Sequence, residues 1–304
     1  MTILELITIA RRDFLDDNVQ EYLWSDTVLA LFATKAEQEA CKRASLLLDD
    51  TTQTADNIAS GTTTSTVANK LVDLGAAFTT AVVGKTVYNT TDNTWAVVTA
   101  RDSGTQLSLS ADIMISGEAY IIGDASKALC RVCVTQGVGD YSLSHKVIKI
   151  DICYLGSLNG VPLFQKTKGW LDRHYYQWRT AEGIPQFYLE ERGRLTLVPK
   201  PSSAFNNNTG KDTLNLEVYR LPLKDLSVSE NNELEIPEEY QFSLVDYICY
   251  LAYSKQGSET EDKQKSAGHL ARFTEKFGVE LSASAESILH EIPSNFVLER
   301  QRFL

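Results

Sequence analysis

The 304-residue chain lacks any long run of apolar residues. A membrane-spanning helix needs about 18 of them in succession, and every apolar stretch here is interrupted sooner by polar or charged residues. The first residues, MTILELITIARRDF, carry Glu5 early and contain no small-residue cleavage site of the kind that ends a secretory signal. We therefore expect a soluble protein that is neither exported nor inserted into a membrane.

Cysteine is scarce, and the five residues are odd in number and scattered through apolar patterns, which excludes a disulfide scaffold and indicates buried thiols in a protein made in a reducing cytoplasm. Only Cys130 and Cys133 are closely spaced. On a strand, residues three apart face opposite sides, and no second pair has zinc-finger spacing. The cysteines are Cys41, Cys130, Cys133, Cys153 and Cys249.

Motifs of catalysis and of cofactor binding are also missing. The four histidines have no metal-binding spacing, and neither a phosphate-binding glycine loop nor a GxSxG nucleophile motif occurs. Adjacent carboxylates such as Glu190 and Glu191 could perform acid–base chemistry, but such pairs ordinarily cap helices or face solvent. We predict no catalytic residue, no metal and no cofactor, and therefore no enzyme.

Positive charge is in deficit, because 29 Lys and Arg stand against 40 Asp and Glu, for a net charge of −11. Tight binding to a nucleic-acid backbone needs clustered cations that displace counterions. The densest basic cluster is short, and we interpret it as the solvated face of a helix. It consists of Lys166, Lys168, Arg173, His174 and Arg179.

Helical spacing of apolar residues is present near both ends of the chain. It predicts a short amphipathic helix over residues 3–15 and a longer one that starts after Ser25, whose hydroxyl can cap it. Pro237 opens a further helix, apolar nearly all round, which we expect to be the central core helix. A last helix ends at Gly278. A shorter helix is predicted over residues 168–178.

Residues 56–124 have a different composition, with twelve threonines, few charges and turn signals between short β-type segments. We predict a small sandwich or barrel inserted into a loop of the surrounding domain. Short strand-like runs such as KVIKIDICYL and RLTLVP then define a second β-region. The predicted fold class is α+β: a helical bundle core with a β-region, an inserted all-β domain and an extended C-terminal tail. The predicted domains are 1–55, 56–124, 125–279 and 280–304.

Two groups of aromatic residues are candidate site residues. The first belongs to the core or to a subunit interface, although part of it could stack on a ligand: Trp24, Trp170, Tyr175, Trp178, Tyr240 and Tyr253. The second either fills the core of the 56–124 module or forms a ligand surface that recognises a host glycan: Tyr88, Trp95 and Tyr120.

The last residues carry apolar and basic side chains beyond Pro293, where no core is left for them to join. Such a tail either docks on another protein or folds back on its own domain. The candidate docking residues are Phe296, Val297, Leu298, Arg300, Arg302, Phe303 and Leu304.

The order and spacing of several short motifs resemble those of tailed-bacteriophage head-to-tail adaptor proteins. Together the motifs cover nearly all of the chain outside residues 56–124 and the tail, and the threonine-rich module is not part of that family's minimal pattern. They are YLWSD (22–26), AEQEACKRA (36–44), GDYSL (139–143), WLD (170–172), GIP (183–185), LVPKP (197–201), VYRLP (218–222), EIPEEY (235–240) and LAY (251–253).

This resemblance implies a structural virion protein that forms a ring of twelve copies at the head–tail junction. Its implied partners are the portal protein, neighbouring subunits, and a downstream tail, nozzle or head-completion protein. Packaged DNA would pass through the ring without sequence-specific binding, and an acidic lumen would prevent the DNA from sticking. The C-terminal tail would dock on the portal. The alternative function is decoration of the neck or tail, or binding of a host glycan, through the 56–124 module.

Overall fold

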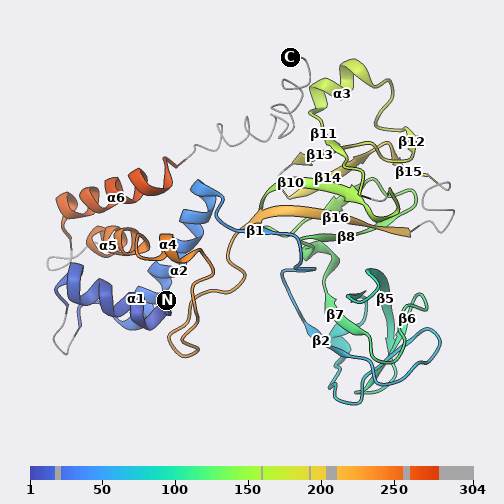
Figure 1. The fold of residues 1–304 in the computed structure, drawn as a ribbon, viewed down its shortest axis with the longest axis horizontal. Helices are drawn as coiled ribbons and strands as arrows, with labels where there is room; N and C mark the ends of the chain where they lie inside the picture. Colours follow the sequence, from blue (N-terminus) through green and yellow to red (C-terminus); the bar gives the residue numbers. More distant parts are fainter. Residues whose placement is uncertain (18–21, 159, 192, 203–210, 256–260, 281–304) are drawn as a thin grey trace. The chain divides into compact units, whose positions relative to one another are not determined.

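The computed structural model describes residues 1–17, 22–158, 160–191, 193–202, 211–255 and 261–280. The chain divides into two compact units (Figure 1). Unit 1 holds Met1–Leu48 together with the chain from Tyr219, and unit 2 holds Asp49–Val218. Each unit therefore has its own core, and each is described separately.

The described elements of unit 1 are mainly helices. Their starts follow ordinary capping chemistry. Thr2 and Glu5 form a capping box, Ser25 accepts the Val28 N–H, and Asp262 accepts two N–H groups of the last helix. The elements are α1 (Ile3–Ile9), the π-helical η1 (Ala10–Leu15), α2 (Asp26–Ala44), α4 (Glu238–Gln241), α5 (Leu244–Ser254) and α6 (Lys263–Phe277).

The core of unit 1 is centred on α5, which packs against both α2 and α6. The helix α2 carries the small buried side chains Ala33, Ala36 and Ala40, and small side chains let packed helices approach closely. In Figure 1, α5 lies between α6 on one side and α1 on the other. This arrangement leaves α1 and α6 on opposite sides of the unit.

Unit 2 is built from sheets. In one, β16 pairs with β1, β8 and β10; a second has the order β11-β13-β14-β9; and β12 pairs with β15. The elements are β1 (Leu48–Asp49), η3 (Ala125–Lys127), β8 (Arg131–Thr135), β9 (Asp140–Ser142), β10 (Val147–Leu155), η4 (Gly156–Leu158), β11 (Phe164–Gln165), α3 (Lys168–His174), β12 (Glu182–Gly183), β13 (Phe187–Glu191), β14 (Arg194–Val198), β15 (Lys200–Pro201) and β16 (Lys211–Arg220).

The threonine-rich stretch forms a six-stranded antiparallel sheet within unit 2, in the order β2-β7-β4-β5-β6-β3. Its core contains buried apolar residues such as Leu71, Val87 and Leu107. A β-bridge between Thr54 and Ala128 joins the chain on either side of the module. Its elements are β2 (Ala59–Thr62), β3 (Lys70–Val72), η2 (Thr80–Val82), β4 (Thr86–Asn89), β5 (Thr94–Arg101), β6 (Gln106–Leu109) and β7 (Ala119–Gly123).

The predicted helical bundle core is wrong. Among the described residues, strands are the majority of the elements, and several sheets occupy residues 49–218, whereas the helices are short. The prediction gave too much weight to the apolar stretches with helical spacing near both ends of the chain. The many short β-type segments between residues 125 and 220 form sheets instead. Some pair with a neighbour in sequence, as β13 does with β14, and others with a distant strand, as β8 does with β16.

Two predicted helices also differ in extent. The helix expected to run continuously from Pro237 is interrupted after Gln241, so that α4 and α5 are separate. The helix predicted through Trp178 ends at His174, and turns follow it. By contrast, the helix after Ser25 begins where it was predicted, and α6 ends at Gly278, whose φ is +89°.

Candidate functional site

A buried carboxylate on α2 fixes the segment that connects β16 with α4. Glu37 is 1% exposed, and its Oε1 accepts the backbone N–H groups of Glu235 at 2.7 Å and Ile236 at 3.2 Å. One turn earlier, the Thr34 hydroxyl accepts the Leu226 N–H at 3.0 Å. Two polar side chains of α2 thus hold the connecting segment against the helix.

Burial and the polar groups around Glu37 set the pKa of its carboxyl group. Burial raises the pKa of Glu37 to about 7. The hydrogen bonds from the two backbone N–H groups lower the pKa, but their effect is smaller than that of burial. The neighbouring Glu235 carboxylate pairs with Arg220 at 2.6 Å and accepts the Leu223 N–H at 2.7 Å. This network uses its polar atoms for internal hydrogen bonds, so we assign it a structural role.

A second buried charge, Arg11 on the π-helical turn η1, organises the chain that leads into α2. Its guanidinium pairs with the buried Asp17 and with Asp26, and donates to the Trp24 carbonyl at 2.5 Å. It also lies 3.9 Å from the ring centroid of Tyr22. Arg11 therefore contacts residues at both ends of the segment that connects η1 with α2.

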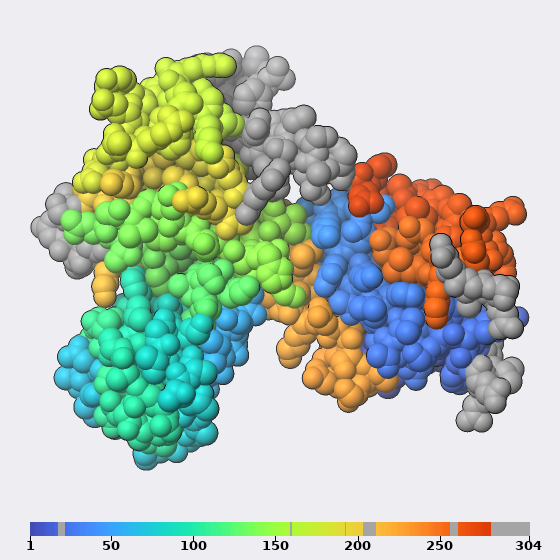
Figure 2. All heavy atoms as spheres, turned by 180° about the vertical axis from the view of Figure 1, so that it is seen from behind, coloured from blue at the N-terminus to red at the C-terminus, as the bar shows by residue number. Residues whose placement is uncertain are grey.

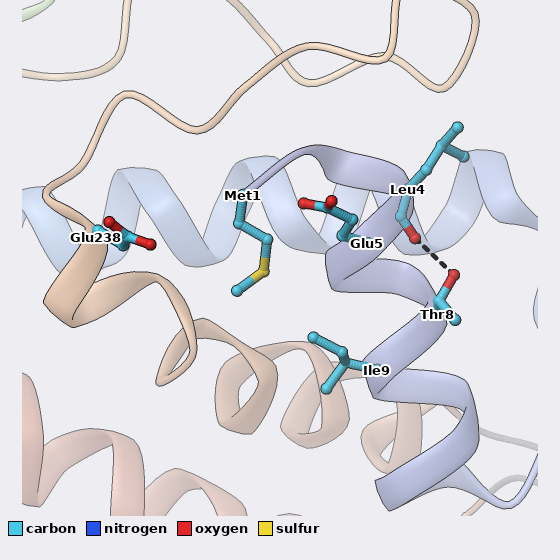
Figure 3. Close-up of a pocket in the computed structure, with 6 residues that line it drawn as sticks. All are labelled: Met1, Leu4, Glu5, Thr8, Ile9 and Glu238. Carbon is cyan, nitrogen blue, oxygen red and sulfur yellow. Dashed lines mark hydrogen bonds between the residues drawn. The ribbon is translucent and has the colours of Figure 1, made fainter.

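A depression lies between α1 and α4 of unit 1 (Figure 3). Met1, Leu4 and Ile9 line it, with the Leu4 side chain pointing away from Met1 and Ile9 in Figure 3, and the carboxylates of Glu5 and Glu238 stand at its rim. Glu5 accepts the Thr2 N–H at 2.8 Å. Within the described residues, neither carboxylate has an ion-pair partner. The depression is open to solvent and combines apolar surface with negative charge.

The outer side of α6 is another exposed surface of unit 1. Ser266, His269, Phe273 and Phe277 are buried, which orients the helix. His269 also bonds Asp246 of α5 at 2.8 Å, and its ring stacks on Tyr253. The exposed residues are Lys263, Gln264, Lys265, Ala267, Gly268, Ala271, Arg272, Glu275 and Lys276.

In unit 2, the helix α3 presents stacked aromatic and cationic groups. The His174 ring stacks on Trp170 with a centroid separation of 4.7 Å, and the Lys166 ammonium lies 4.7 Å from the Trp170 ring. Exposed apolar side chains, including Tyr176 at 87%, lie nearby in the sequence. This surface is suited to protein contact, since aromatic and cationic groups are enriched at interfaces.

The predicted basic cluster coincides with this region, and part of it is neutralised locally. Lys168 pairs with Glu191 at 2.7 Å, and Arg179 pairs with Asp172 at 2.7 Å. His174 and Arg173 are exposed. Because carboxylates interleave with the cations, the cluster does not form a continuous positive patch of the kind that a nucleic-acid backbone requires.

Three of the candidate aromatics lie together around α3. Trp178 is buried with Leu171 and Val198, and its Nε1 donates to Asp172 at 2.8 Å. Partly buried Trp170 and Tyr175 pack against the same cluster and contact Phe187. The three residues, which come from a 9-residue stretch, thus share one apolar cluster.

The candidates of unit 1 lie in its interior or at its margin. Trp24 and Tyr253 are buried and meet edge to face, with ring centroids 6.3 Å apart. The Tyr253 hydroxyl donates to the Phe14 carbonyl at 2.9 Å. Tyr240 is half-buried, packs on Phe277, and lies under the Lys276 ammonium.

The candidates of the 56–124 module lie in different places. Tyr88 and Tyr120 are 3% and 2% exposed, and the Tyr120 hydroxyl donates to Asp73 at 2.7 Å inside the module. Trp95 is half-buried, and its Nε1 donates to the Asp212 carbonyl of β16 at 3.0 Å. The two tyrosine rings are therefore covered and present no stacking face to a ligand.

Trp95 belongs to a contact between the module and the neighbouring strands of unit 2, which meet in Figure 2. Besides the bond to Asp212, the Lys211 ammonium lies 5.1 Å from the Trp95 ring centroid, and Thr213 donates to the Asn93 carbonyl at 3.1 Å. The contact uses the turn between β4 and β5 and the start of β16.

Adjacent acidic residues serve different purposes on β13. Glu191 is exposed and pairs with Lys168, whereas Glu190 is 8% exposed and its Oε2 has no hydrogen-bond partner among the described residues. Burial raises the pKa of Glu190 to about 7, although the Ile150 N–H and Lys149 lower it. Neighbouring strand residues face opposite sides, which separates the two carboxylates.

The candidate tail residues, from Phe296 to Leu304, lie outside the described residues. The polar anchors Glu37 and Arg11 were not predicted from the sequence. Glu37 shares the buried face of α2 with Ala33, Ala36 and Ala40, so its position among small apolar residues is the signal that could have identified it. No comparable pattern marks Arg11.

A scan against protein-family models matches residues 121–288 to a model described as SU10 adaptor protein. The match covers more than half of the chain and extends from β7 through α6. A search of the curated proteins finds no match.

The protein is thus a structural adaptor of a phage particle. More particularly, the chain belongs to the SU10 adaptor protein family. No helix in the described part of the chain is long and apolar enough to cross a membrane.

Proposed function

We propose that the chain forms a closed ring of twelve copies that joins the portal vertex of the phage head to the tail and continues the DNA channel. The observation that carries this proposal is the family match, which includes strands of unit 2 and helices of unit 1. Neighbouring adaptor subunits, the portal protein and a downstream tail component are the proposed partners.

The charge of the chain supports a conduit. A ring of copies that each carry −11 repels the phosphate backbone, so that DNA moves past without sticking. The cations around α3 are interleaved with carboxylates, which agrees with this role.

The C-terminal segment is proposed to dock on the portal through its apolar and basic residues beyond Pro293. Truncation after Pro293 tests this. We expect the truncated protein to keep its thermal unfolding midpoint and to lose cosedimentation with purified portal rings. Unchanged cosedimentation would contradict portal docking by the tail.

The 56–124 module is proposed as an insertion that the adaptor function does not need. Its alternative role as a glycan-binding element has no support from Tyr88 and Tyr120, which are covered. Deleting residues 56–124 should leave the joining of portal and tail intact in an in vitro assembly assay. A deletion variant that folds but no longer joins them would assign the module to the junction itself.

A further inference from the structure

Two exposed surfaces of unit 1, the outer side of α6 and the α1–α4 depression, differ in charge. The outer side of α6 carries Lys263, Lys265, Arg272 and Lys276 against the single carboxylate of Glu275. The depression between α1 and α4 is bordered by Glu5 and Glu238, and Glu239 follows on α4. A chain with a surplus of acid thus gathers cations on one helix and carboxylates around one depression.

Arg272 is already paired with Asp246 of α5 at 2.9 Å, whereas the lysines near the start of α6 are held less closely. Lys263 has a side chain that is 89% exposed and pairs only loosely, at 3.3 Å, with Glu261. Lys265 lies 4.0 Å from Asp262 and over the Tyr253 ring. The carboxylates of Glu5 and Glu238 lack ion-pair partners among the described residues. Both surfaces therefore remain available for charges of another molecule.

The two surfaces are distinct: α6 packs on α5, whereas the depression lies between α1, on the other side of α5 in Figure 1, and α4, whose Tyr240 packs on Phe277 of α6. In a closed ring, every copy presents one surface to the neighbour before it and a different surface to the neighbour after it. Two different surfaces that complement each other are what such a head-to-tail contact requires. An isologous dimer would instead require one surface that is complementary to itself.

The outer side of α6 is also shaped for a close approach. Ala267, Gly268 and Ala271 lie between its cations and project little. A methyl group added at Gly268 would meet no atom of the described residues within 4 Å, apart from its own helix. Glycine destabilises a helix interior relative to alanine, so a close approach of a neighbouring copy would account for a glycine at this position.

We propose that the outer side of α6 in one copy docks into the α1–α4 depression of the next copy. Lys263 and Lys265 would face Glu5 and Glu238, while the small residues of α6 pack on the apolar surface of Met1, Leu4 and Ile9. The occupant of the depression is a second copy of this chain. This inference rests on the proposed ring and specifies its subunit contact.

Charge exchange tests the contact, with native mass spectrometry of the full chain mixed with portal protein as the measurement. Lys263→Glu with Lys265→Glu, and separately Glu5→Lys with Glu238→Lys, should each lower the fraction of complete rings at least tenfold. All four changes in one chain should restore it. Negative charge near the start of α6 suits the helix dipole, so the first variant should keep its fold.

The control exchanges an exposed ion pair of unit 2, Lys168→Glu with Glu191→Lys, and should leave the rings unchanged. If wild-type rings form but the charge reversals do not weaken them, or the fourfold variant does not recover, the proposed contact is wrong. If the wild-type chain forms no ring with the portal, the proposed function itself fails.

Gly268→Ala gives an independent test that separates folding from assembly. The isolated chain should unfold at a higher temperature, whereas its rings should form less completely because the methyl group occupies the contact. Gly169→Ala on α3, where an added methyl group also meets open space, should not affect rings. Equal ring formation by the Gly268→Ala variant would contradict the close approach at this position.

Discussion

Glu37 and Glu235 are 198 residues apart, yet the Glu37 carboxylate accepts the backbone N–H of Glu235 at 2.7 Å. The bond joins the helix α2 before the inserted module to the segment that follows β16. It completes unit 1 from two distant parts of the chain. Removing its acceptor should therefore affect the unit as a whole.

Replacing Glu37 with Gln should remove a pH dependence of stability. The pKa of Glu37 is about 7 in the folded protein, above the ordinary glutamate value of 4.5, so the unfolded chain loses this proton first as the pH rises. Between these values the folded state holds more protons, and the free energy of unfolding falls with pH by on the order of 2 kcal/mol. Glu37→Gln should lack this fall and keep the acceptor.

Urea unfolding at pH 5 and pH 8 measures the difference. Glu37→Ala serves as the comparison, because it loses the acceptor for two buried N–H groups and should be less stable at both pH values by roughly 1–3 kcal/mol. Identical pH dependence in wild type and Glu37→Gln would show that this carboxyl group does not titrate as described.

Arg11→Ala should destabilise unit 1 strongly. It leaves the buried Asp17 carboxylate without its cation, at a cost of about 3–5 kcal/mol. The double variant Arg11→Ala with Asp17→Ala should recover part of the loss. Arg12→Ala is the matched control, since Arg12 pairs with Asp13 at the surface and should change stability little. Chemical denaturation that shows equal effects for Arg11 and Arg12 would contradict the assigned burial.

Glu190→Gln should stabilise the protein at pH 8 and have little effect at pH 5. The pKa of Glu190 is raised to about 7, so the carboxyl group carries its proton at pH 5 and an unfavourable buried charge at pH 8. The gain at pH 8 should be on the order of 1–2 kcal/mol. Glu191→Gln, on the opposite face of β13, should show no such gain. Calorimetric midpoints at the two pH values provide the comparison.

Tyr120→Phe should weaken the 56–124 module. It removes the hydrogen bond to the buried Asp73 carboxylate and leaves that acceptor without the hydroxyl, which costs roughly 1–3 kcal/mol. Tyr176→Phe is the control, because Tyr176 is 87% exposed. Thermal unfolding followed by near-ultraviolet circular dichroism would detect the loss, and an unchanged midpoint would contradict the buried hydrogen bond.

Local signals in the sequence predicted local structure well. Ser25 begins α2 and Gly278 follows α6, because capping depends on a few adjacent residues. Strand pairing was harder to foresee. β16 pairs with β8, about 80 residues earlier, and that partnership depends on the whole sheet rather than on either segment. Because strand pairing could not be foreseen, the helical spacing near the termini was given too much weight in predicting the fold class, and the predicted bundle core was wrong.

The candidate surfaces show the same difference between local features, which the sequence indicates, and features that depend on distant segments. Aromatic content drew attention to Trp170 and Trp178, which share one apolar cluster. Residue type could not indicate that Tyr88 is covered or that Glu37 is buried, because each depends on a segment far away in the chain. The charge contrast between α6 and the α1–α4 depression also requires folding to bring Glu5 beside Glu238.

Native mass spectrometry of the full chain, alone and mixed with the portal protein encoded near it, is the most direct test of the proposed ring. We expect a complex that contains equal numbers of the two proteins, twelve of each, and that keeps this stoichiometry over a range of salt concentrations. Absence of any association with the portal protein at every salt concentration would contradict the proposed role as the ring that joins head to tail.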